Sequence, residues 1–91
     1  MSDRNAEERQ WRLYLDDMIA FAEKVLEYTQ ALEKDTFIAD GLRYDATLRN
    51  IELIGEAATH IPNNVRDDHP EIPWRMIIAT RNRLIHGYLG L

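Results

Sequence analysis

The chain has 91 residues, a formal net charge of −5 and no cysteine. This length predicts one domain, residues 1–91, with a small core, and a chain without cysteine has neither a disulfide framework nor a thiolate metal site. The first thirty residues are too charged for a signal peptide, and no apolar run approaches the about 18 residues that span a membrane. We therefore expect a soluble cytoplasmic protein without a membrane partner.

The charge is distributed unevenly along the chain. Residues 1–71 contain all 16 acidic residues and eight basic ones, whereas residues 72–91 contain no acid and three arginines, Arg75, Arg81 and Arg83. A cationic segment on an acidic body can hold an anionic ligand, while the body discourages indiscriminate nucleic-acid binding. Arginines that pair with acids elsewhere in the fold are the alternative, and composition leaves both open.

Three long stretches have helical periodicity, and no stretch alternates like a strand. The first spans about residues 5–33, with Asn5 and Glu8 as a capping box at its start. Its apolar and aromatic residues form two neighbouring stripes. Such a wide apolar surface predicts a helix covered by its own bundle on one side and by a partner chain on the other.

A short helix and a second long helix are expected next. Asp35 or Thr36 suits the cap of a short helix that ends near Asp40, and Gly41 permits a bend. The second long helix spans about residues 42–61 and has an inward stripe of apolar and aromatic residues: Tyr44, Leu48, Ile51, Ile54, Ala58 and Ile61.

A polar link over residues 63–72 leads into the third long helix. Pro73 suits the first position of that helix, where the missing N–H of proline costs nothing. The helix then runs to about His86, and Gly87 is a natural stop signal. Together these elements predict an all-α fold, an antiparallel helical bundle.

Arg81, His86 and Tyr88 lie in or beside this otherwise apolar third helix, where a guanidinium, an imidazole and a phenol are costly to bury. On an α-helix, Arg81 and His86 are offset by about 140°. One straight helix therefore cannot easily aim both side chains at the same atom. Either the helix breaks near Gly87, or a second copy of the chain completes the site around a two-fold axis.

An arginine–histidine pair without evident metal ligands suits the cleavage of RNA. The ribose 2′-hydroxyl is the nucleophile, His86 moves protons near neutral pH, and the arginine stabilises charge on the phosphate. The product ends in a 2′,3′-cyclic phosphate, and no metal or other cofactor is required. In the alternative, structural interpretation, the helix dipole favours the histidine and the arginine sits in a buried ion pair.

Glu56 on the second long helix lies beside Gly55, which lets another helix approach closely. We expect its carboxylate to pair with an arginine of the third helix, with Arg81 as the first choice. The pair either holds the guanidinium in place for the reaction or is only structural. Glu56 and His60 also have the spacing of half a metal site, but no further ligands complete it, so no metal site is predicted.

Five other side chains have a structural interpretation, and four of them also have a functional one. Trp11 and Trp74 are expected to be packing anchors rather than platforms for stacked bases. Arg75 and Arg83 either guide the RNA backbone or only solvate the outer face of the third helix. His69 is expected to be a solvated residue of the polar link.

The segment Arg81-Asn-Arg-Leu-Ile-His86-Gly-Tyr88 resembles the signature of the HEPN superfamily, in which arginine, four residues, histidine, one residue and tyrosine follow one another. More specifically, the chain resembles the HepT-like toxins of prokaryotic HEPN–nucleotidyltransferase toxin–antitoxin pairs. Three further segments support this closer match, which spans roughly residues 10–90: Tyr44-Asp45-Ala46, Ile54-Gly-Glu-Ala-Ala58 and Pro70-Glu-Ile-Pro-Trp74.

The resemblance implies a HEPN-type bundle, a homodimer and a metal-independent endoribonuclease site built from both protomers, in a type VII-like toxin–antitoxin pair. By position, Arg81 and His86 would be the catalytic pair, and Asn82 would orient or bind the phosphate, with Glu56 in support. Tyr88 matches the tyrosine that the partner, an MNT-family nucleotidyltransferase antitoxin, modifies with AMP. The adduct would add bulk and negative charge where an RNA phosphate must sit. The substrate would be tRNA or mRNA.

Family members usually continue past this tyrosine into a C-terminal helix that packs on the bundle, whereas this sequence stops at Leu91. We therefore expect a bundle without that helix, with an apolar face left to a dimer partner. The main rival interpretation is a non-catalytic helical dimer that binds the nucleotidyltransferase. A weaker one is a nucleotide-binding helical domain that uses the same arginines.

Overall fold

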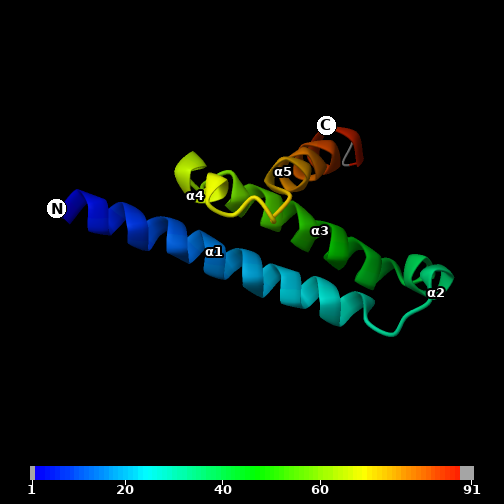
Figure 1. The fold of residues 1–91 in the computed structure, drawn as a ribbon. Coiled ribbons are helices and arrows are strands. Elements are labelled where there is room, and N and C mark those ends of the chain that lie inside the picture. Colours follow the sequence, from blue (N-terminus) through cyan, green and yellow to red (C-terminus); the bar gives the residue numbers. More distant parts are fainter. Residues whose placement is uncertain (1, 89–91) are drawn as a thin grey trace.

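Two long antiparallel helices, α1 (Ser2–Thr29) and α3 (Gly41–Ala58), form the body of the molecule (Figure 1). They belong to a computed structural model that describes residues 2–88, and the side chains of residues 4–87. The remaining elements are α2 (Lys34–Ala39), α4 (Asn63–Asp67), α5 (Trp74–Arg83) and a π-helical turn, η1 (Leu84–Tyr88). The described residues form no strand, which confirms the predicted all-α class.

The helix α3 is central, because it packs against α1 on one side and against α5 on the other (Figure 1). A buried cluster of Ala58, Ile61, Val65 and Trp74 lies where the end of α3 meets α4 and the start of α5. The apolar stripe of α1 packs against this cluster through Trp11, Tyr14, Leu15 and Met18. The core therefore sits at the end of the molecule from which α5 departs.

Two side chains fix the segment that leads into α5. The indole Nε1 of Trp74 donates a hydrogen bond to the carbonyl of His69 at 3.0 Å. Arg66 on α4 donates from Nε to the carbonyl of Ile61 at 2.9 Å. Trp74 is 8% exposed and Trp11 packs on the core, so both tryptophans are packing anchors, as predicted.

The ends of α1 differ from the prediction. The helix begins at Ser2, so Asn5 lies inside it and the predicted capping box is wrong. Glu8 instead forms an ion pair with Arg12, one turn further on, with 3.0 Å between Oε1 and Nη2. The helix ends at Thr29, four residues early, and Ala31 then takes the left-handed conformation, with φ 61°, that commonly follows a helix end.

Three apolar side chains of α1 are exposed in a single chain. Leu13, Ile19 and Leu26 are 63%, 58% and 64% exposed. The two apolar stripes predicted for this helix lie on one half-buried side, which packs against α3, and these three side chains lie outside the stripes. Coverage of the other side by a partner chain stays a prediction.

The capping predictions for α2 are also wrong. Glu33 occupies its N-cap and makes no side-chain cap bond, so Asp35 and Thr36 lie within the helix. Asp40 instead caps α3, because its side chain accepts a hydrogen bond from the backbone N–H of Arg43 at 3.2 Å.

The segment between α3 and α5 is more ordered than its polar composition indicated. α3 ends at Ala58, three residues earlier than predicted. The link 63–72 then contains the short helix α4, whose Val65 is buried in the core cluster. One apolar residue is too weak a periodic signal to predict a helix. Pro73 takes the N-cap of α5 rather than its first helical position.

Within the described range, no helix combines the length and the apolar character needed to cross a membrane. The prediction that a further C-terminal helix is absent falls outside the described residues and stays a prediction.

Candidate functional site

The position of α5 on α3 is set at Gly55. A Cβ at this residue would lie 3.0 Å from the carbonyl oxygen of Ile77 and 2.9 Å from Cγ of Arg81. It would also meet Cβ of Arg81, so both helix backbone and side chain would have to move. Glycine therefore permits a close approach that no other residue allows, and this approach brings Arg81 directly over α3.

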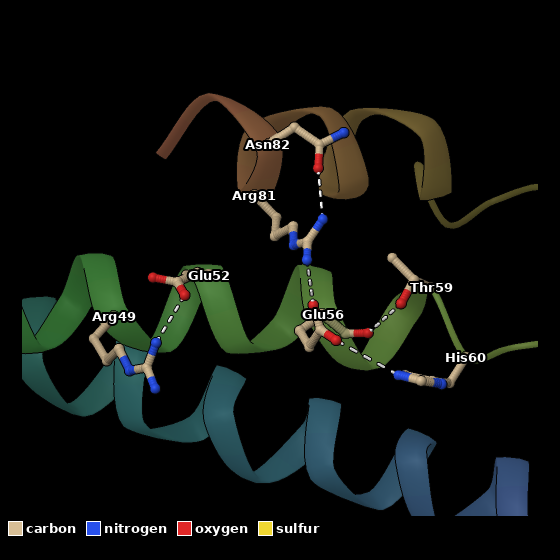
Figure 2. A network of polar contacts seen from close by, with 7 residues as sticks. All are labelled: Arg49, Glu52, Glu56, Thr59, His60, Arg81 and Asn82. Carbon is tan, nitrogen blue, oxygen red and sulfur yellow. Dashed lines mark hydrogen bonds and ion pairs between the residues drawn. The ribbon is translucent and has the colours of Figure 1, made fainter. Parts of the chain in front are cut away.

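The Arg81 guanidinium is held from two sides (Figure 2). Nη2 donates to Oε2 of Glu56 at 2.6 Å, and Nη1 donates to Oδ1 of Asn82 at 2.8 Å. The ion pair predicted between Glu56 and Arg81 is therefore confirmed. The Arg81 side chain is 27% exposed and that of Glu56 is 47% exposed, so water reaches the pair and its strength is moderate.

The guanidinium keeps donors for a ligand. Arginine has five N–H donors, and the two hydrogen bonds above use one on each Nη atom. Nε of Arg81 is buried and has no partner among the described residues. The second N–H of each Nη can therefore bind an anion, while Glu56 and Asn82 fix the plane of the group.

His86 lies beyond the end of α5, in the turn η1. It is exposed, and with Asn82, Arg83 and Gly87 it lines an open depression of about 580 Å³. The described residues that line this depression do not include Arg81. Asn82 connects the two groups, because its side chain binds Arg81 and also borders the depression with His86.

The turn that carries His86 is not α-helical. α5 ends at Arg83, and residues 84–88 form the π-helical turn, so the prediction of an α-helix to His86 that stops at Gly87 is wrong. The wider π turn has i→i+5 hydrogen bonds, so each residue advances by less than the about 100° of an α-helix. This winding reduces the angular offset between Arg81 and His86 that an α-helix would give.

The other predicted site residues lie in three places. Arg83 borders the His86 depression. Arg75 lies at the opposite end of α5 and lines a separate groove of about 960 Å³ with Pro73 and Met76. The backbone of Tyr88 closes η1, but its side chain lies outside the described residues, so its role stays a prediction.

One set of contacts was not predicted. Nε2 of His60 lies 3.6 Å from Oε1 of Glu56, and the Tyr14 ring stacks on the imidazole, with 4.3 Å between centroids and 9° between planes. The spacing of Glu56 and His60 had been considered only as half a metal site. Residues 4–87 contain no group of three side chains that could hold a metal ion.

Comparisons with known proteins show the family of the chain. The family described as Ribonuclease HepT-like matches residues 18–91. The chain is 40% identical over 78 residues to a protein of Thermococcus cleftensis named "Probable ribonuclease HepT", which covers 86% of this chain and 71% of the relative. No solved structure matches significantly.

Two further relatives have RNase names. One from Methanocaldococcus jannaschii is 35% identical over 83 residues, covering 91% of this chain and 76% of the relative. One from Caldanaerobacter subterraneus is 32% identical over 80 residues, covering 88% of this chain and 71% of the relative. The family match includes α3, α5 and the whole candidate site. The chain therefore belongs to the HepT-like ribonuclease family, as the four sequence segments had indicated.

Proposed function

We propose that this protein is a metal-independent endoribonuclease in which Arg81 and His86 are the catalytic residues. The observation that supports it best is the guanidinium of Arg81, which Glu56 and Asn82 hold with unused N–H donors. A fixed cation with free donors is suited to a phosphate whose negative charge grows in the transition state. Asn82, at the rim of the His86 depression, gives the same phosphate a polar neighbour.

In the proposed reaction the RNA supplies its own nucleophile, so no metal-bound water is needed. His86 takes the proton of a ribose 2′-hydroxyl, and O2′ attacks the adjacent phosphorus. The O2′–P bond forms, the P–O5′ bond breaks, and the proton is passed to the departing 5′ oxygen. Arg81 neutralises the charge on the non-bridging oxygens. The products end in a 2′,3′-cyclic phosphate and a 5′-hydroxyl.

The proposed site is shared between two protomers of a homodimer. Within one chain, Arg81 binds Glu56 on α3, whereas His86 is exposed and lines a depression whose described lining does not include Arg81. A two-fold axis beside η1 would bring the His86 of one copy to the Arg81 of the other. Arg83, beside His86, would then hold the RNA backbone. Arg75 lines a separate groove, so any RNA contact it makes is more distant.

The test is cleavage in the presence of EDTA. Purified protein is incubated with total RNA, including tRNA and mRNA, and the 3′ ends of the products are analysed for cyclic phosphate. We expect cleavage by the wild type and none by His86→Ala. A wild type that cleaves nothing but still binds a nucleotidyltransferase tightly would favour the non-catalytic module.

We further propose that this ribonuclease is the toxin of a type VII-like pair and that an MNT-family nucleotidyltransferase silences it by AMP transfer to Tyr88. Membership of the HepT-like family and the place of Tyr88 in η1, two residues after His86, support this. An AMP group there would put a negative charge in the path of the RNA phosphate.

Tyr88→Phe is expected to remain an active ribonuclease in the presence of the nucleotidyltransferase and ATP, because it has no hydroxyl to modify. Incorporation of labelled AMP and RNA cleavage are measured together. Tyr28→Phe is the control, and it should be labelled and silenced like the wild type. AMP incorporation into Tyr88→Phe would refute the assignment.

Glu56→Gln is expected to lower RNA cleavage about tenfold, since a hydrogen bond to a charged group contributes ~1.5 kcal/mol. The amide can still accept from Arg81, but it no longer holds the guanidinium by charge. Glu52→Gln is the matched control, because Glu52 lies one turn earlier on α3 and pairs with Arg49 at 2.7 Å (Figure 2). Equal activity of the two variants would assign Glu56 a structural role only.

A further inference from the structure

His60 is a restrained polar residue beside the candidate site that the proposed reaction does not use. It lies in the turn just after α3, and its backbone N–H donates to the carbonyl of Ala57 at 3.0 Å. Arg66 binds the carbonyls on both sides of it, that of Ile61 at 2.9 Å and that of Thr59 at 3.4 Å. The backbone at His60 is therefore fixed in place by α4.

The imidazole ring is fixed as well. Tyr14 on α1 stacks on it almost in parallel, at 4.3 Å between ring centroids. The side chain of His60 is nevertheless 45% exposed, so this stack is not part of the buried core. An exposed ring that is held by another helix and by a fixed backbone has a defined direction, and that direction is toward Glu56 (Figure 2).

Glu56 lies between His60 and Arg81, with one carboxylate oxygen for each. Oε2 accepts from Nη2 of Arg81 at 2.6 Å, and Oε1 lies 3.6 Å from Nε2 of His60. The second separation is too long for a hydrogen bond, but a protonated imidazole attracts the carboxylate at this distance. The titratable or charged groups around this cluster include Tyr14 on α1, Arg66 on α4 and Arg81 on α5.

It matters for Arg81 that the two carboxylate oxygens of Glu56 face different partners. A carboxylate that is free to turn can bind a guanidinium with both oxygens, in the strong fork-like geometry. That arrangement would occupy the second N–H of the guanidinium that a phosphate needs. With Oε1 directed to His60, Glu56 holds Arg81 through a single oxygen and leaves donors for the ligand.

We propose that His60, directed by the Tyr14 stack, is a positioning residue for RNA cleavage: it keeps Glu56 bound to Arg81 through one oxygen and so sets the orientation of the guanidinium. The proposal rests on the proposed function, because it assigns His60 to the Arg81 site. His60 itself touches neither the phosphate nor the reacting oxygens.

The kinetic test uses His60→Leu and His60→Gln in the full chain. His60→Leu is expected to lower kcat about two- to fivefold, the range of an exposed ion pair, with KM nearly unchanged. His60→Gln supplies an N–H donor toward Oε1 and should recover most of the loss. His69→Leu is the matched control, because His69 is an exposed histidine that pairs with Glu71 at 3.2 Å, away from Arg81.

A double-mutant cycle separates positioning from a general loss of stability. In the Glu56→Gln background, His60→Leu should have no further effect on kcat, because its route to Arg81 is already broken. Additive losses would overturn the proposal. Thermal unfolding of each variant shows whether it is folded, and His60→Gln gives the answer if His60→Leu is not.

A second readout does not depend on activity. The ¹⁵N resonances of the Arg81 guanidinium are assigned by their disappearance in Arg81→Lys. His60→Leu should shift them and His69→Leu should not, and unchanged resonances in His60→Leu would overturn the proposal. A wild type that cleaves no RNA overturns the proposed function, and these resonances still decide whether His60 orients Arg81.

Discussion

An equal mixture of Arg81→Ala and His86→Ala proteins is expected to regain about a quarter of wild-type RNA cleavage, although each variant alone is inactive. In one chain, Arg81 binds Glu56, while His86 lines a depression whose described lining includes Asn82 but not Arg81. If each active pair takes one residue from each protomer, a mixed dimer has one intact pair of two. Half of the dimers are mixed after random exchange, so about a quarter of the pairs are intact.

The measurement is RNA cleavage before and after the two proteins are unfolded and refolded together. Mixing without subunit exchange is the control, and it should show no recovery. A double variant with both substitutions in one chain, mixed and exchanged with the wild type, separates the two arrangements. Shared sites leave about a quarter of the pairs intact, whereas sites built within one chain leave about half. No recovery after verified exchange would mean that each chain supplies both catalytic residues of its own site.

Gly55→Ala is expected to have the second large effect. A Cβ at this position meets Arg81 and the carbonyl of Ile77, so α5 must move away from α3. We expect a loss of about 1–3 kcal/mol in the free energy of unfolding, as for overpacked helix contacts. Cleavage should fall about a hundredfold, since a displacement near 1 Å at a catalytic group has this cost.

Gly41→Ala is the matched control, because a Cβ at Gly41 meets nothing within 4 Å. Urea unfolding and RNA cleavage are measured for both variants. Gly41→Ala should keep the stability and activity of the wild type, since it adds the same methyl group to the same helix. Gly55→Ala with wild-type stability would show that α5 does not depend on this close approach.

The sequence predicted the existence of each long helix, since apolar residues recur at helical spacing over many turns. It also predicted the pair of Glu56 with Arg81, because a glycine beside an acid suggested a close helix contact. Helix ends were less predictable. Asn5 has the pattern of a cap but lies inside α1, and the single apolar residue Val65 did not indicate α4.

Contacts between helices were the least predictable part of the site. Periodicity indicates which face of a helix is apolar, but not how far one helix is displaced along another. The stack of Tyr14 on His60 depends on that displacement between α1 and α3. The π-helical winding of residues 84–88 has no apolar period of its own, so the direction of His86 could not be derived from spacing.

This winding also affects how the motif can vary among related proteins. A π turn contains more residues per turn than an α turn, so the distance along the chain from Arg81 to His86 does not by itself fix their relative direction. A change of winding in η1 can compensate for an inserted or deleted residue between them, while α5 stays packed against α3 at Gly55. We therefore expect the motif to accept a change in the number of residues between Arg81 and His86, but not a side chain at Gly55.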